Sequence, residues 1–139
     1  MIVFIGCGKK KNNHKCEAQY MYLGRFFNTC LNYARTFESD IYILSAKYGI
    51  LRLSDEITPY DLTLNTMNKE ERINWYNKVK RQVEELHLDT DQEVIFLCGK
   101  NYYDGLLPIF PNNKRPLDGI GGIGCQMSFM NSKLKRKLF

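Results

Sequence analysis

The sequence predicts a three-layer α/β fold, in which a small and mainly parallel sheet has helices on both faces. Three short apolar runs carry this prediction, at residues 1–7, 41–45 and 93–98. Apolar runs of this length, bounded by turn residues, are typical of buried strands. The first two runs are separated by a helical pattern. A strand–helix–strand unit of this length places its two strands parallel.

Length and composition favour one ordinary globular unit. We expect residues 1–139 to form a single α/β domain, because a chain of this size can bury a substantial core. No stretch reaches the roughly 18 apolar residues of a membrane span, and the first strand meets glycine and lysine too early for a signal peptide. The expectation is a cytoplasmic protein with no membrane partner. The sequence leaves its oligomeric state open.

The five cysteines are scattered and include no C-x-x-C pair, so we expect free thiols. Cys7, His14 and Cys16, even with His87 or Cys98, match no common zinc spacing. The sequence therefore predicts no metal and no cofactor. The net charge of +5 permits a phosphate-bearing partner without demonstrating one.

The elements follow in order from these patterns. Residues 8–15 form a polar, lysine-rich loop, which either contacts phosphate or is simply a mobile surface loop. The next helix, after Gly24, has an apolar face. After the strand at 41–45, residues 45–49 are expected to be a loop, and residues 50–58 a linking loop. The helical face consists of Phe26, Phe27, Cys30, Leu31 and Ala34.

Pro59 restricts its own backbone and that of its neighbour, so Tyr60 and Asp61 are expected to be held rigidly. Asn68 and Glu71 have the spacing of a capping box that opens a helix over about 69–86. A short helix or loop follows the strand at 93–98, residues 114–118 form a short last strand or extended segment, and a helix covers about 123–137. The expected buried stripes are Ile73, Tyr76, Val79, Val83 and Leu86 in the first long helix, with Trp75 beside them, and Met127, Met130, Leu134 and Leu138 in the last.

Each of the three strands ends in two small residues and a lysine. Ligands of open parallel sheets bind outside the carboxyl ends of the strands. Glycine lets a ligand approach the backbone, and lysine supplies positive charge. We predict that Lys9, Lys47 and Lys100 converge on one anionic ligand. The plain alternative is that these are ordinary solvated strand ends. The three endings read Cys7-Gly8-Lys9, Ser45-Ala46-Lys47 and Cys98-Gly99-Lys100.

Residues 119–124 fit G-x-G-x-x-G literally. A dinucleotide site needs that motif directly after a strand, inside a βαβ unit and with a later acidic residue, so we reject this interpretation. Two interpretations remain open. Gly119, Gly121 and Gly124 present free backbone N–H groups to an anion, or they let the last helix pack closely on the sheet.

The order of these motifs resembles a bacterial and phage domain family of unassigned function, over nearly the whole chain. The chain is more distantly similar to the peroxide-stress protein family YaaA, although it is shorter and would lack the DNA-binding helical insertions of that family. It also faintly resembles a domain of archaeal enzymes that modify a deazaguanine base in transfer RNA. The resemblance implies a compact α/β domain and nucleotide or nucleic-acid chemistry, with no assigned reaction. The motifs are Cys7-Gly8-Lys9-x-Lys11, Tyr22-x-Gly24-x-x-Phe27, residues 44–51, Pro59-Tyr60-Asp61, Met67, Trp75, Pro116-Leu117-x-Gly119 and Gly124.

Two functions from different classes follow. The first is an enzyme that processes a nucleotide or nucleic acid, with a nucleobase or its glycosidic bond as a candidate target. In it, lysines such as Lys47 hold phosphate and Asp61 acts as acid, base or charge stabiliser. A Cys7 nucleophile with His14 as its base is a second mechanism. Glycosidic chemistry uses a second carboxylate, for which Asp55, Glu56, Asp104 and Asp118 are all available.

The second function is a non-enzymatic nucleic-acid-binding or stress-response module, which would use the 9–15 loop and the basic run 133–137. Under either function the partner is a nucleotide or nucleic acid. Tyr22, Tyr48 and Tyr60 are available to stack on a base. The catalytic candidates are Asp61, Lys47 and Cys7, and the ligand-binding candidates are Gly8, Lys9, Lys11, Tyr22, Ser45, Tyr48, Gly49, Tyr60, Gly99, Lys100, Gly119, Gly121 and Gly124.

Overall fold

The computed structural model describes the backbone of residues 1–138 and the side chains of residues 1–135. Its main sheet has five strands in the order β4-β3-β1-β6-β7. Strands β3, β1, β6 and β7 are mutually parallel, and β4 runs antiparallel to β3. The mainly parallel α/β fold is therefore confirmed. The strands are β1 (Ile2–Gly6), β3 (Asp40–Ser45), β4 (Gly49–Arg52), β6 (Val94–Leu97) and β7 (Asn113–Lys114).

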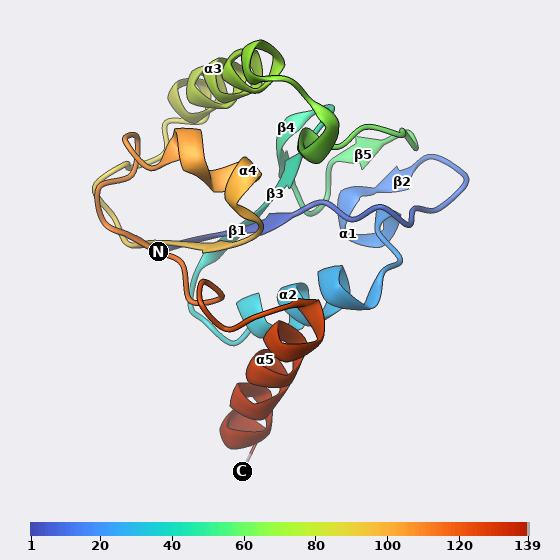
Figure 1. Cartoon of the computed structure of the whole chain (residues 1–139), viewed down its shortest axis with the longest axis vertical. Helices are drawn as coiled ribbons and strands as arrows, with labels where there is room; N and C mark the ends of the chain where they lie inside the picture. The colour runs from blue at the N-terminus through green and yellow to red at the C-terminus, as the bar shows by residue number, and fades with distance from the viewer. Residues whose placement is uncertain (139) are drawn as a thin grey trace.

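Helices cover both faces of this sheet, as Figure 1 shows. Helices α1 (Ala18–Met21), α2 (Arg25–Ala34) and α5 (Ile123–Leu138) lie on one face. Helices α3 (Lys69–Glu85) and α4 (Lys100–Tyr103), with the short helices η1 (Leu64–Thr66) and η2 (Asp104–Leu106), lie on the other. The central strand β1 is buried on both sides because its side chains alternate between the two cores.

Helix α3 begins with the predicted capping box, in which the Asn68 side chain accepts from the Glu71 N–H and the Glu71 carboxylate accepts from the Asn68 N–H. Trp75, Val79 and Val83 form its buried stripe. The prediction that Ile73 belongs to this stripe is wrong, because its side chain is 46% exposed. Ile73 lies two residues before Trp75, which is about 200° around the helix and places it on the solvent side.

The prediction that residues 50–58 form a linking loop is wrong. The chain turns at residues 46–48 and returns as β4, which pairs Ile50 with Leu44 and Leu51 with Ile43. It then forms β5 (Glu56–Ile57), which pairs antiparallel with β2 (Cys16–Glu17) as a separate two-stranded sheet. The two apolar residues after Gly49 are buried in this arrangement, which explains why the segment forms a strand.

The later elements agree with the sequence in outline. The last strand is shorter and earlier than the predicted 114–118, since only Asn113 and Lys114 pair with β6. Met130 is the fully buried residue of α5, whereas Met127 and Leu134 are half-buried, and the predicted contact of Leu138 lies outside the described side chains. None of the helices in the described part of the chain is long and apolar enough to cross a membrane.

Candidate ligand site at the carboxyl edge of the sheet

The parallel register brings the three predicted strand ends to one edge. Gly6 lies opposite Leu44, and Ile5 lies opposite Leu97, so the residues that follow these pairs are neighbours. The Cys7 N–H continues the ladder by donating to the Leu44 carbonyl over 3.0 Å. This is the edge at which ligands of open parallel sheets bind.

Three hydroxyl groups meet at this edge, and we call Ser45, Tyr60 and Tyr22 the hydroxyl chain. Ser45 Oγ donates to Tyr60 Oη over 2.7 Å, and the Oη atoms of Tyr60 and Tyr22 are 2.6 Å apart. Ser45 Oγ also accepts from the backbone N–H groups of Lys47 and Tyr48. Ser45 is fully buried, and these N–H donors orient its own proton toward Tyr60.

The hydroxyl chain has one more proton than its internal bonds use. The Ser45 hydroxyl donates its proton to Tyr60, and one of the two phenols donates its proton to the other. The remaining O–H, on Tyr22 or Tyr60, can donate to a further acceptor. Burial is the main cause that raises the pKa of both tyrosines, and the adjacent Cys7 thiol adds to the rise. Both phenols therefore stay protonated at neutral pH and act as hydrogen-bond donors.

A lysine ammonium lies against the hydroxyl chain. Lys11 Nζ is 4.4 Å from the centroid of the Tyr60 ring and 6.0 Å from that of Tyr22. A backbone bridge between Lys11 and Tyr22 ties the 8–15 loop to this position. Such a cation–π contact is worth about 0.5–1 kcal/mol where the site is exposed. The site thus combines a positive charge with a spare O–H donor.

Residues 58–66, which we call the strap, run across the strand ends. At one end, Tyr48 Oη contacts Thr58 Oγ1 over 2.9 Å, and this hydrogen bonding is the main cause that lowers the pKa of Tyr48. In the middle, Tyr60 joins the hydroxyl chain. At the other end, Asn65 Oδ1 accepts from Asn101 Nδ2 over 2.9 Å. The strap therefore connects the turn after β3 with α4, which follows β6.

The strap presents its two predicted site residues in different ways. Tyr60 lies inside the hydroxyl chain, whereas Asp61 is exposed, and no hydrogen bond or ion pair of its carboxylate occurs among the described residues. Three of the four possible second carboxylates have partners, and one of them is Glu56, which forms an ion pair with Lys15 over 3.8 Å. Asp55 accepts from the Arg52 N–H, and Asp118 accepts from Tyr103 Oη. The catalytic role of Asp61 remains a prediction.

Cys7 lies at the same edge with a different partner from the one predicted. Its Sγ atom is 3.4 Å from Tyr102 Oη. Burial raises the pKa of Tyr102, so this phenol stays protonated and is a poor base. His14 is exposed and contacts its neighbour Asn13. Within the described residues, no three His, Cys, Asp or Glu side chains are grouped so that they could hold a metal ion.

The predicted lysines and glycines are distributed around this edge. Lys9, Lys47 and Lys100 are exposed, and Lys47 Nζ lies 5.1 Å from the Tyr48 ring. Gly8 packs near Tyr22 and Phe27, and Gly99 opens α4. The glycine-rich turn before α5 contains Gly119 and Gly121 at positive φ, followed by the exposed Gly124. The Tyr103–Asp118 hydrogen bond ties this turn to α4.

Gly49 fixes the turn that carries Ser45, and its surroundings were not foreseen. It has φ +75°, and a Cβ atom there would lie 2.1 Å from Gln82 Oε1. Gln82 accepts from the Ile50 N–H over 2.8 Å and donates to the Tyr48 carbonyl over 2.9 Å. Trp75 Nε1 donates to the Ser45 carbonyl over 2.9 Å. A polar Gln82 beside the apolar stripe of α3 was the available sequence signal.

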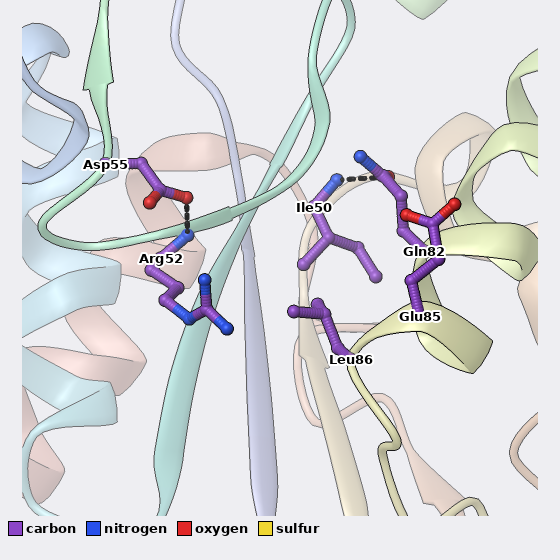
Figure 2. Close-up of a pocket in the computed structure, with 6 residues that line it drawn as sticks. All are labelled: Ile50, Arg52, Asp55, Gln82, Glu85 and Leu86. Carbon is purple, nitrogen blue, oxygen red and sulfur yellow. Dashed lines mark hydrogen bonds between the residues drawn. The ribbon is translucent and has the colours of Figure 1, made fainter.

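Two cavities of the described structure lie away from the hydroxyl chain. A cavity of about 110 Å³ separates β4 from the end of α3, and Figure 2 shows Arg52 and Asp55 on one side of it and Gln82 and Glu85 on the other. A second, of about 390 Å³, lies near the start of β3 and is lined in part by Ser39 and Arg52. Neither is lined by the hydroxyl chain. We place the candidate site at the carboxyl edge because hydrogen-bond donors and a positive charge converge there.

Comparison with known proteins gives a family without an assigned activity. A family described as a family of unknown function (DUF6884) matches residues 2–132. The chain is also 32% identical over 146 residues to a Bacillus subtilis (strain 168) protein named "Uncharacterized protein YfjM", in an alignment that covers 98% of this chain and 96% of that protein. The predicted membership of a family of unassigned function is confirmed, and the chain belongs to the DUF6884 family.

Proposed function

We propose that this protein is an enzyme that binds a phosphate-bearing ligand, a nucleotide or a nucleic acid, at the carboxyl edge of its sheet. The observation that carries the proposal is the spare O–H donor of the hydroxyl chain beside the Lys11 ammonium. A neutral donor and a cation at one place suit an anionic oxygen, because charge-assisted hydrogen bonds are the stronger kind. The exposed Lys47, on the turn that Ser45 organises, would add a second positive charge.

The reaction proposed is hydrolysis or transfer at the bound nucleotide, at its nucleobase or its glycosidic bond. Donors that are already aligned stabilise charge that develops in a transition state, and the hydroxyl chain would supply them. Asp61 follows Tyr60 directly on the strap, so an anchored tyrosine would hold the loop that presents this carboxylate. The similarity to the YaaA family that the motifs suggest favours the same ligand class and remains a prediction.

Ligand binding is tested by thermal shift with nucleoside mono-, di- and triphosphates and short oligonucleotides. A ligand at 100 times its Kd stabilises the folded state by about 2.7 kcal/mol. We expect this shift in the natural protein and its loss in Lys11→Gln and Tyr60→Phe. Lys80→Gln and Tyr20→Phe are matched controls, because Lys80 is exposed on α3 and Tyr20 is 60% exposed. Equal shifts in all four variants would contradict the proposed site.

Catalysis is tested separately on any nucleotide that binds. Asp61→Asn should abolish turnover and leave the thermal shift unchanged, and full activity of this variant would remove Asp61 from the mechanism. The exposure of Lys9, Lys10 and Lys15 favours a second candidate, a binding module without turnover. That candidate predicts shifts only with oligonucleotides, which fade as salt is added.

A further inference from the structure

Charge is divided unequally between the parts of the chain that form the two helical layers. Residues 1–37 and 119–139 together hold ten basic residues and one acidic residue, a net charge of +9, whereas residues 38–118 have a net charge of −4. Helices α1, α2 and α5 contain no Asp or Glu at all. These three helices cover the same face of the sheet (Figure 1). The three helices of this layer therefore carry basic and neutral polar side chains and no carboxylates, and Glu17 directly precedes α1.

The solvent side of α2 and α5, which we call the α2–α5 face, has donors that suit phosphate. Arg25 and Lys135 are exposed, and none of the ion pairs among the described side chains involves them. Neutral polar side chains lie on the same helices, and such groups commonly bind phosphate oxygens. The exposed neutral residues are Asn32, Ser128 and Asn131, together with Asn28 and Ser132, whose side chains already donate to nearby backbone carbonyls.

The opposite layer offers no such excess. Helix α3 carries five basic and four acidic residues, so its charges largely compensate one another. A polyanion would therefore approach the molecule from the α2–α5 face. The 8–15 loop, which leads from β1 into β2 and α1, adds exposed lysines and carries Lys11 to the hydroxyl chain.

The α2–α5 face exposes too few apolar side chains to bind a membrane surface. Within the described residues, α2 and α5 expose a single large hydrophobic side chain, that of Ile123. A helix that binds at a lipid interface needs a continuous apolar face to insert. The face is basic and polar instead, which fits the backbone of a nucleic acid.

We infer that the α2–α5 face docks the backbone of a nucleic acid, so that the ligand of the carboxyl-edge site is a nucleic acid and not a free nucleotide. This inference rests on the proposed function for the site itself and adds the surface that holds the rest of the ligand. Contacts to phosphate alone are independent of sequence and strongly dependent on salt.

The test is fluorescence anisotropy of a labelled 20-nucleotide DNA, single-stranded and as a duplex, titrated with the full chain at several KCl concentrations. The variant combines Arg25→Gln, Lys133→Gln and Lys135→Gln. For the duplex, each lost phosphate contact reduces the magnitude of the slope of log K against log salt by about 0.9, which is about eightfold in affinity at 0.1 M salt relative to 1 M salt. Three lost contacts would lower the affinity by about 500-fold.

The control variant removes the same number of charges from α3, through Lys69→Gln, Lys80→Gln and Arg81→Gln. All three side chains are exposed. The inference requires that the control variant keeps the salt slope of the natural protein to within about 0.9, the contribution of one phosphate contact, and its affinity to within about eightfold. An equal loss in both variants would overturn it, because only net charge would then matter. The inference would also be overturned if anionic phospholipid vesicles, at equal phosphate concentration, displaced the labelled DNA from the protein.

The anisotropy titration and the thermal-shift assay with nucleotides together separate this inference from the proposed function. If Lys11→Gln abolishes nucleotide binding while the α2–α5 variant keeps full affinity for the oligonucleotide, the docking face is wrong and the site stands. If the α2–α5 variant loses the oligonucleotide while Lys11→Gln and Tyr60→Phe change nothing, the face stands as a nucleic-acid surface and the carboxyl-edge site is wrong.

Discussion

Replacing Gly49 with alanine tests how the turn after β3 is held. The glycine has φ +75°, a conformation that costs a residue with a Cβ atom about 1–2 kcal/mol. The new Cβ would also displace Gln82 Oε1, which breaks the bonds of Gln82 to the Ile50 N–H and the Tyr48 carbonyl. Two hydrogen bonds contribute about 1–3 kcal/mol in net terms. The expected loss is about 2–5 kcal/mol, or a fall in Tm of about 7–17 °C for a chain of this length.

The assay is urea unfolding followed by the fluorescence of Trp75, which is the single tryptophan and lies beside this turn. Gly124→Ala is the control, because a Cβ there meets nothing within 4 Å and alanine favours the helix. In Gly49→Ala/Gln82→Ala the clash is absent, so the double variant should lose less than the sum of the two single losses. A change of under about 0.5 kcal/mol in Gly49→Ala would refute this account of the turn.

Three further predictions concern the core and the thiols. The pKa of Tyr60 is raised in the folded state, so the free energy of unfolding should be intact below the unfolded pKa of about 10 and should fall above it. Tyr60→Phe should reduce this alkaline slope, measured by urea unfolding, by up to about 1.4 kcal/mol per pH unit. An unchanged slope would contradict the burial of this phenol. Trp75→Phe leaves the buried Ser45 carbonyl without its donor and should cost about 1–3 kcal/mol in thermal unfolding, whereas a neutral effect would exclude this bond. Iodoacetamide should label the exposed Cys125 and spare Cys30, whose pKa burial raises to about 12, and mass spectrometry of early time points would expose the reverse order.

The parallel core could be predicted because its signals are local. Each buried strand is a short apolar run, and the alternation along β1 places its side chains in two cores. The hairpin of β3 and β4 was missed although Ile50 and Leu51 are apolar and follow a glycine. A strand followed by small residues and a lysine is also typical of a strand with a ligand loop, and the return of the chain depends on a turn of only three residues, 46–48.

The sequence predicts where the candidate site lies, but it does not predict which side chains form it. Strand ends with small residues and lysines indicated the correct edge, because parallel strands must finish together. Which side chains meet there depends on contacts between residues far apart in the chain, such as Tyr22 with Tyr60 and Cys7 with Tyr102. The rigid Pro59 turn was recognised, but nothing local indicates that Tyr60 faces inward and Asp61 faces solvent.

An NMR titration of the ¹⁵N-labelled protein with adenosine monophosphate and a short oligonucleotide tests the central claim most directly, because it locates the ligand on the backbone. The account predicts that the largest amide shifts occur at residues 7–11, 45–49 and 58–61, and that Lys11→Gln removes them. Shifts confined to the cavity between β4 and α3, around Ile50 and Glu85, would contradict a site at the carboxyl edge. So would the absence of shifts at concentrations of either ligand up to about 10 mM, since binding weaker than that is worth less than about 3 kcal/mol.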